Sequence, residues 1–141
     1  MAGSDSPVIG LDIGHVRIGV ARGWPSTGTA SPLTTINNDD QVLTTITDLC
    51  NVEQPSVLVI GLPRNLDGDD TPQTAYVREF VERLQSSVSL PVVLQDEALT
   101  SRKAEAELAG RGKPFQKSDI DALAATYIVE DYLHTAGVGN G

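Results

Sequence analysis

The sequence predicts an α/β fold in which a five-stranded mixed sheet is flanked by helices. Three short apolar segments separated by turn residues occupy the first part of the chain, a pattern typical of an antiparallel meander. Farther on, two strand-like runs alternate with helical patterns, as expected for strands joined by crossover helices. The first of these runs, residues 56–61, is almost continuously apolar and predicts a strand buried on both faces.

The meander is expected to use strands over residues 8–13, 18–22 and 29–36. A helix over 39–51 follows, because apolar side chains recur there at helical spacing and Pro55 stands beyond its end. After the strand over 56–61, we expect a helix over 73–86, a strand over 91–95, and helices over 101–109 and 118–134. This is the element order of the ribonuclease H-like fold, and open sheets of this kind place their sites at the carboxyl ends of strands.

Length and composition indicate one domain over residues 1–141, with flexible ends at 1–6 and 135–141. The sequence has one cysteine, Cys50, so neither an internal disulfide nor a thiolate zinc site is expected. The first residues lack a basic segment followed by an apolar one, and no run reaches membrane-spanning length. We therefore expect a cytoplasmic protein without a membrane partner.

The net charge of −9 disfavours a nucleic-acid binder that works by bulk attraction, because phosphate binding usually depends on clustered Lys and Arg. Half of the ten basic residues nevertheless fall within residues 102–117, a stretch with only two acids. A local basic patch is therefore expected on an acidic protein, and it comprises Arg102, Lys103, Arg111, Lys113 and Lys117.

Three acidic residues in separate segments are the main functional candidates. Asp12 lies in the apolar run VIGLDIG, where a carboxylate is costly to bury unless a cation neutralises it. Glu97 directly follows the run PVVLQ, and Asp121 lies near the start of the last helical pattern. Brought together, they would form a site of hard oxygen ligands that suits Mg2+ or Mn2+. Structural alternatives stay open, since Glu97 could be a solvated loop acid and Asp121 could form a capping box with Ser118.

Two turns carry groups that suit a phosphate. In DIGHVRIG, Gly14 and Gly19 would let a phosphate or metal approach the backbone, although a plain hairpin also needs glycine there. His15, in the same turn, is interpreted as a solvated surface residue. The loop IGLPRNLDG presents Arg64 and Asn65 after a buried strand, and either phosphate binding or ordinary turn chemistry explains them.

Four ordered blocks within residues 8–133 resemble the signature blocks of the YqgF/RuvX family of ribonuclease H-like endonucleases, namely GLDIGHVRIGVARG, VIGLPRNLDG, QDEALTS and DIDALAATYIVEDYL. The resemblance implies that Asp12, Glu97 and Asp121 are the catalytic carboxylates and the ligands of Mg2+ or Mn2+. It also implies two ions about 4 Å apart, with Asp12 as the bridging ligand. Two positions depart from the family pattern: His15 stands where Thr or Ser is usual, and Ala98 where Arg is usual.

The resemblance further implies hydrolysis of phosphodiester bonds in structured nucleic acid, and we expect processing of the 5′ end of pre-16S rRNA. Resolution of Holliday junctions is the alternative, and it would call for a two-fold symmetric homodimer, whereas a monomer can trim an RNA end. The substrate-binding residues expected from the motifs and the basic patch are Arg64, Asn65, Arg102, Lys103, Lys113 and Lys117.

Two further function classes stay open. Actin-like sugar kinases and ATPases share the pattern DxGxxxxG of the first block, but their architecture needs two such domains around a nucleotide, and this chain has the length for one. A nucleic-acid-binding module without catalysis would agree with Ala98 and with the acidic charge. Metal-dependent cleavage separates an enzyme from both.

Overall fold

The computed structural model describes residues 6–65, 67–97 and 100–140, without the side chains of 100–102 and 136–140. Its elements follow the predicted order. They are β1 (Val8–Ile13), β2 (Arg17–Trp24), β3 (Thr29–Asn37), α1 (Val42–Glu53), β4 (Val57–Pro63), α2 (Pro72–Gln85), β5 (Val92–Glu97), α3 (Thr100–Gly110) and α4 (Lys117–Asn140).

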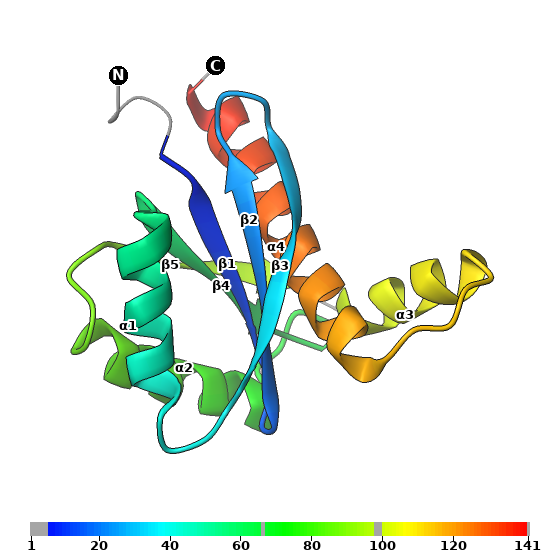
Figure 1. The fold of residues 1–141 in the computed structure, drawn as a ribbon, viewed down its shortest axis with the longest axis horizontal. Helices are drawn as coiled ribbons and strands as arrows, with labels where there is room; N and C mark the ends of the chain where they lie inside the picture. Colours follow the sequence, from blue (N-terminus) through cyan, green and yellow to red (C-terminus); the bar gives the residue numbers. More distant parts are fainter. Residues whose placement is uncertain (1–5, 66, 98–99, 141) are drawn as a thin grey trace.

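The strands form one mixed sheet in the order β3-β2-β1-β4-β5. β1, β2 and β3 pair antiparallel as the predicted meander, whereas β4 pairs parallel with both β1 and β5. Helices α1 and α2 cover one face of the sheet and α4 covers the other (Figure 1). The predicted five-stranded mixed sheet is confirmed, and β1, β4 and β5 end at the same edge of it.

Several predicted boundaries differ from the structure. Helix α1 begins at Val42 rather than at residue 39, because the side chain of Asp39 accepts a hydrogen bond from the backbone of Gln41 and closes a turn before the helix. Strand β5 extends to Glu97 rather than stopping at residue 95, so Glu97 belongs to the sheet. Helix α4 continues to Asn140, beyond the predicted end at residue 134.

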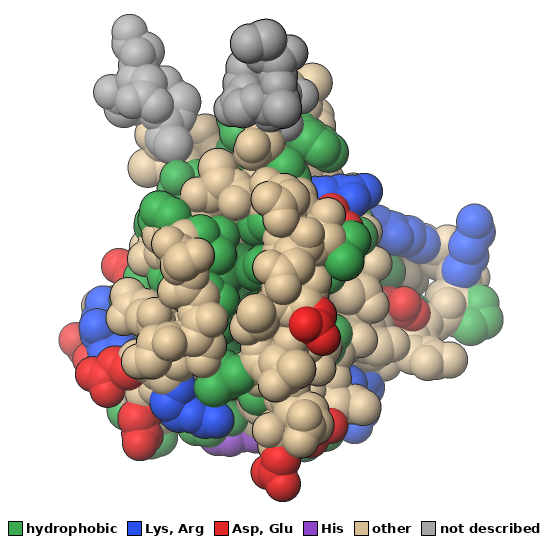
Figure 2. Space-filling view, turned by 60° about the vertical axis from the view of Figure 1, so that its left-hand side comes forward, with side chains coloured by type: hydrophobic (Ala, Val, Ile, Leu, Met, Phe, Trp, Pro, Cys, Tyr) green, Lys and Arg blue, Asp and Glu red, His purple; other side chains and the backbone are tan. Residues whose placement is uncertain are grey.

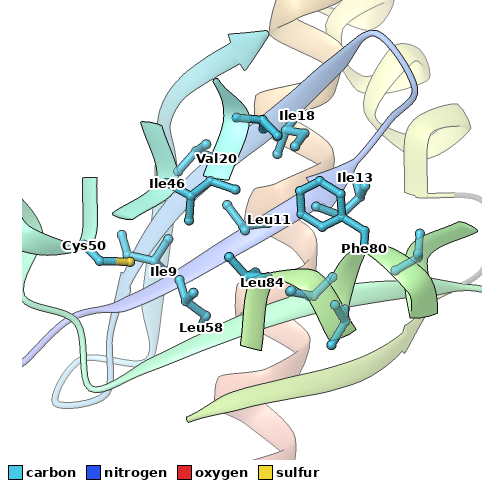
Figure 3. Close-up of a cluster of buried hydrophobic side chains, with 14 of the residues drawn as sticks. Ile9, Leu11, Ile13, Ile18, Val20, Ile46, Cys50, Leu58, Phe80 and Leu84 are labelled. Atoms are coloured by element: carbon cyan, nitrogen blue, oxygen red, sulfur yellow. The ribbon is translucent and has the colours of Figure 1, made fainter. Parts of the chain in front are cut away.

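The face under α1 and α2 is filled by large aliphatic side chains. Alternate residues of β1, including Ile9 and Leu11, point to this face because the side chains of a strand alternate. They pack against Ile46 of α1 and against Phe80 and Leu84 of α2 (Figure 3). These side chains are almost fully buried, so this face holds the larger part of the hydrophobic core.

The face under α4 is lined by glycines instead. A Cβ atom added at Gly10, Gly19 or Gly23 would overlap atoms of α4, and one added at Gly61 would overlap the side chain of Ile128. The glycines come from β1, β2 and β4, so they form a shallow floor across the middle of the sheet. Because of this floor, α4 lies closer to the sheet than ordinary side chains would allow.

Helix α3 projects away from the sheet (Figure 1) and packs against α4. The contact is a small apolar cluster built from Ala104 and Leu108 of α3 and Leu123 and Tyr127 of α4. Phe115, in the connection between the two helices, also packs against this cluster.

Candidate active site

Asp12 and Glu97 point to the same face of the sheet. Asp12 alternates with Ile13 and Leu11 of the core, so its side chain lies on the face that α4 covers. Glu97 shares that face with Val93, which packs under α4. The two strands are linked through β4, since a Cβ atom added at Gly61 would lie 3.7 Å from Cγ of Glu97. Their shared face, on two strands that both pair with β4, thus brings two carboxylates toward each other.

Asp121 reaches the same region because of a glycine in the sheet. Asp12 pairs directly with Gly19 across β1 and β2. The backbone of Asp121 lies where a side chain at residue 19 would project, so α4 crosses the sheet beside Asp12. Gly19 had been assigned either to phosphate approach or to hairpin geometry, and the structure instead gives it the role of admitting α4. Gly14 fits the hairpin interpretation, since its backbone N–H donates to the carbonyl of Arg17 at 3.0 Å.

Asp121 is paired with a cation from the opposite end of the sequence. Nε of Arg17, the first residue of β2, donates to Oδ2 of Asp121 at 2.6 Å. The capping alternative for Asp121 is not what the structure shows: Asp119 accepts the hydrogen bond from the backbone N–H of Gln116 at the start of α4. The helix start is therefore capped by Asp119, and the carboxylate of Asp121 faces the site.

The other two carboxyl groups have raised pKa values. Burial, with a smaller contribution from the charge of Asp121, raises the pKa of Asp12 from 3.8 to about 7. Burial, followed by the neighbouring Asp131, raises the pKa of Glu97 from 4.5 to about 8, and Asp12 adds a smaller effect in the same direction. In addition, Oε1 of Glu97 is buried without a hydrogen-bond partner among the described residues. Within the described part of the chain, burial and the neighbouring carboxylates thus outweigh the cations that act on these two groups.

Asp131 is a site residue that the sequence analysis missed. It lies on α4 and acts directly on the carboxyl group of Glu97. Helical spacing is the signal that could have identified Asp131. It lies three residues after Ile128, so both side chains share the helix face that packs over Gly61. One turn of helix therefore carries a hydrophobic contact and an acid toward the end of β5.

The donor set fits a divalent cation by its chemistry. Carboxylates held together away from water are stable as anions only near a positive charge, and oxygen ligands select hard ions such as Mg2+ or Mn2+. Oε1 of Glu97, which is buried and has no hydrogen-bond partner among the described residues, is an available ligand atom. Among the described residues, however, no group of three or more His, Cys, Asp or Glu side chains is gathered closely enough to hold an ion. The three predicted ligands share one region, and Asp121 is turned toward Arg17.

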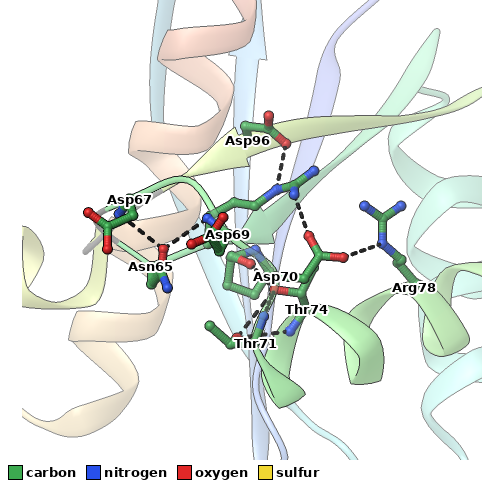
Figure 4. A network of polar contacts seen from close by, with 10 residues as sticks. Asn65, Asp67, Asp69, Asp70, Thr71, Thr74, Arg78 and Asp96 are labelled. Atoms are coloured by element: carbon green, nitrogen blue, oxygen red, sulfur yellow. Dashed lines mark hydrogen bonds and ion pairs between the residues drawn. The ribbon is translucent and has the colours of Figure 1, made fainter.

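The loop after β4 is organised by its own polar contacts (Figure 4). Arg64 forms ion pairs with Asp70 and, at 3.4 Å, with Asp96. The side-chain oxygen of Asn65 accepts hydrogen bonds from the backbone N–H groups of Asp67 and Asp69, at 3.0 and 2.9 Å. Asn65 therefore performs the turn chemistry that the sequence analysis gave as one alternative. Phosphate binding by Arg64 and Asn65 stays a prediction.

The basic patch lies on the projecting α3 segment and the connection to α4. Lys103, Lys113 and Lys117 are exposed, and Lys and Arg side chains are visible along this projection (Figure 2). The side chain of Arg102 lies outside the described residues, as does Ala98, so neither expectation is tested. Lys103 differs from the other two lysines because its ammonium group lies 4.4 Å from the centre of the Tyr127 ring.

His15 is exposed as predicted, yet it takes part in a network. Its Nε2 lies 2.7 Å from the side-chain oxygen of Gln73, and its ring lies 4.1 Å from that of Tyr76, centre to centre. Asn38 completes the network, because its Nδ2 donates both to the carbonyl of Gly14 and to the hydroxyl of Tyr76. The β1–β2 hairpin beside Asp12 is thereby attached to α2.

The architecture is that of Holliday junction resolvases of known structure. The chain superposes on RuvC of T. thermophilus, solved in complex with a Holliday junction substrate, with a TM-score of 0.58 and 15% identity over 93% of this chain and 95% of that one. The Fowlpox virus Holliday junction resolvase gives a TM-score of 0.53 and 14% identity over 92% and 99%. At such identities the likeness shows the fold, which is a RuvC-like ribonuclease H fold.

Sequence comparison is more specific. A family model described as "RuvX: Holliday junction resolvase" matches residues 6–135. A protein of Sulfurihydrogenibium sp. (strain YO3AOP1) is 40% identical over 96% of this chain and 94% of its own length, and one of Methylobacillus flagellatus is 41% identical over 94% and 93%. Both are named "Putative pre-16S rRNA nuclease". The chain belongs to the RuvX/YqgF family.

No described helix combines the length and the apolar character that a membrane span requires.

Proposed function

We propose that this protein is a Mg2+- or Mn2+-dependent nuclease that hydrolyses phosphodiester bonds in structured nucleic acid and processes the 5′ end of pre-16S rRNA. The observation that carries the proposal is the placement of Asp12 and Glu97, both partly buried, on one face of the sheet beside Asp121. A fold gains no stability from burying such groups together unless something positive joins them. The names of the sequence relatives support the choice of RNA.

In this proposal Asp12 is the central ligand, because its carboxyl group interacts with those of both Asp121 and Glu97. Glu97 would offer Oε1, which has no hydrogen-bond partner among the described residues, and Asp121, which pairs with Arg17 in the metal-free protein, would turn toward the cation. When bound, a divalent ion supplies Lewis-acid polarisation of the phosphate and activation of the attacking water.

The chain's own residues would orient the substrate around this site. Arg17 becomes available to a phosphate oxygen once Asp121 is engaged elsewhere, and its guanidinium can offer two parallel donors. Glu97 carries a proton at neutral pH in the metal-free protein, since its pKa is about 8. Binding of a cation should therefore release protons, and the affinity for Mg2+ should rise between pH 6 and pH 8. Calorimetry in buffers of different ionisation enthalpy measures this release directly.

The decisive experiment is cleavage of an RNA that contains the 5′ leader of 16S rRNA by the purified protein. We expect cleavage with Mg2+ or Mn2+, little with Ca2+, whose longer and looser coordination misplaces the water, and none in EDTA. Asp12→Asn should abolish cleavage while leaving the protein folded. Activity in EDTA equal to that with Mg2+ would exclude the metal-dependent mechanism.

Resolution of Holliday junctions is the second candidate, favoured by the description of the matching family model. It predicts a stable dimer that makes paired, symmetric nicks in a four-way DNA junction. Light scattering with and without a junction, together with cleavage of both substrates, separates the two. A dimer that nicks the junction symmetrically and leaves the RNA intact would replace rRNA processing as the proposed function.

A further inference from the structure

One of the three lysines in the chain is placed differently from the other two. Lys103 lies on α3 with its ammonium group 4.4 Å from the centre of the Tyr127 ring, within the range of a cation–π interaction. Lys113 lies in the connection between α3 and α4, Lys117 is the first residue of α4, and both are exposed. A lysine stem is flexible in water, so a ring beneath the ammonium group restricts where the charge can lie.

Tyr127 is itself fixed. It belongs to α4 and is only 7% exposed, in the small cluster between α3 and α4. Its hydroxyl donates to Oε1 of Glu107 on α3, while Oε2 of the same carboxylate accepts from Arg111. Tyr127 therefore contacts α3 at two points one helical turn apart, through its ring at Lys103 and through its hydroxyl at Glu107.

The charge of Lys103 reaches the candidate active site. Among the groups that act on Glu97, Lys103 is a cation that lowers its pKa, against the larger effects of burial and of Asp131. The site otherwise has Arg17 on the side of Asp121. Helix α3 begins three residues after Glu97, so Lys103, in its first turn, lies on the side of the site that Glu97 forms.

We propose that Tyr127, tethered by Glu107, is a positioning residue that holds the Lys103 ammonium group at the Glu97 side of the site, where it contacts a phosphate of the nucleic acid. This inference rests on the proposed function for the identity of the substrate. The stacking of Lys103 on Tyr127 is independent of the proposed function and can be tested without nucleic acid.

The stacked lysine can be observed by NMR. Reductive methylation with 13C-formaldehyde labels the three lysines and the amino terminus, and Lys103→Gln assigns one of the signals. We expect the methyl resonance of Lys103 to lie upfield of those of Lys113 and Lys117 because of the ring current, and to move to the position of the other two in Tyr127→Leu. A Lys103 resonance that coincides with the other two in the unmodified sequence would overturn the inference, whatever the protein cleaves.

The contact with phosphate is tested by a double-mutant cycle. Affinity for an RNA containing the 16S 5′ leader is measured by fluorescence anisotropy in the Asp12→Asn background, which prevents cleavage. Lys103→Gln should weaken binding about fivefold to tenfold and reduce the salt slope by about one. Tyr127→Leu should weaken it about threefold to fivefold when Lys103 is present, and by less than about 1.5-fold in the Lys103→Gln background.

Three controls separate positioning from a general structural role. Lys103→Arg should keep most of the affinity, because a guanidinium also stacks on an aromatic ring. Tyr127→Phe, which keeps the ring and the fold, should give a smaller loss than Tyr127→Leu. Tyr127→Leu should show no coupling with Lys117→Gln. Equal effects of Tyr127→Leu with and without Lys103 would overturn the positioning role. Intact coupling together with no cleavage of any substrate would leave this inference standing and refute the proposed function.

Discussion

The two faces of the sheet are built on opposite principles. The face under α1 and α2 buries large aliphatic side chains such as Leu11 and Ile46, and such burial favours folding. The face under α4 has glycines at its centre and the carboxyl groups of Asp12 and Glu97 at its edge. Close helix packing there brings acids together at an energetic cost. One face therefore carries most of the stability, and the other gives up part of it to form a site.

The largest effect is expected from filling the glycine floor. Gly19→Ala places a Cβ atom against the backbone of Asp121, which cannot rotate away as a side chain could. The loss of stability should exceed the ~1–3 kcal/mol typical of overpacking, and cleavage should be lost because Asp121 moves away from Asp12. Urea denaturation and the cleavage assay measure both.

The matched control is Gly110→Ala at the end of α3, where an added Cβ atom meets nothing within 4 Å. It should be neutral or slightly stabilising, by about 0.5–1 kcal/mol, because alanine is the better helix former. If Gly19→Ala were as harmless as Gly110→Ala, the glycine floor would have no role in placing α4.

The second effect is a pH dependence that belongs to the α4 face. The folded protein holds protons on Asp12 and Glu97 that the unfolded chain releases near pH 4, so the folded state binds more protons between pH 4 and about pH 8. In EDTA, stability should therefore fall as the pH rises through this window. For Asp12 the loss is on the order of 4 kcal/mol by pH 8, about 1.4 kcal/mol for each unit of the pKa shift.

Asp12→Asn removes one of these groups and should flatten the decline, and Mg2+ should restore stability at pH 8 by neutralising the carboxylates. Denaturation midpoints at pH 5.5 and pH 8.5, with EDTA and with Mg2+, are the measurement. A decline of unchanged size in Asp12→Asn would show that the buried carboxyl group of Asp12 is not its source.

The third prediction concerns the counter-ion of Asp121. Arg17→Gln removes a half-buried, charged hydrogen bond and leaves three carboxyl groups without this cation. In EDTA it should cost about 1–2 kcal/mol. With saturating Mg2+ the cost should shrink, because the ion takes over the neutralisation. Thermal denaturation of both proteins in the two conditions tests this, and a cost that grows with Mg2+ would indicate that Arg17 orients Asp121 for the ion instead of competing with it.

The smallest effect is expected on the aliphatic face. Ile46→Val deletes one methylene group from a fully buried position of α1 and should cost about 1 kcal/mol. Both the pH dependence and the rate of cleavage per folded molecule should match those of the unmodified protein. A changed pH profile in Ile46→Val would mean that the two faces are not independent.

The sequence alone determined the order of strands and helices, the mixed sheet and the three acids to examine. Periodicity and turn residues report on contacts within one element or between neighbours, and these decided the five strands and four helices. The resemblance of the four blocks then pointed to the family that the comparisons confirm. A predicted helix start was wrong where a side chain forms a turn with the backbone, as Asp39 does before α1.

The tertiary structure decided which partners these residues meet. Asp119 and Asp121 are equivalent as helix-start acids in the sequence, and only the crossing of α4 over Gly19 assigns one to the cap and the other to Arg17. Arg17 and Asp121 lie 104 positions apart, so no local pattern relates them. The same holds for Asp131 beside Glu97. Long-range pairs depend on how closely two elements pack. Here the glycines of the sheet set the distance between α4 and the strands, and the periodicity of apolar residues does not reveal how close that contact is.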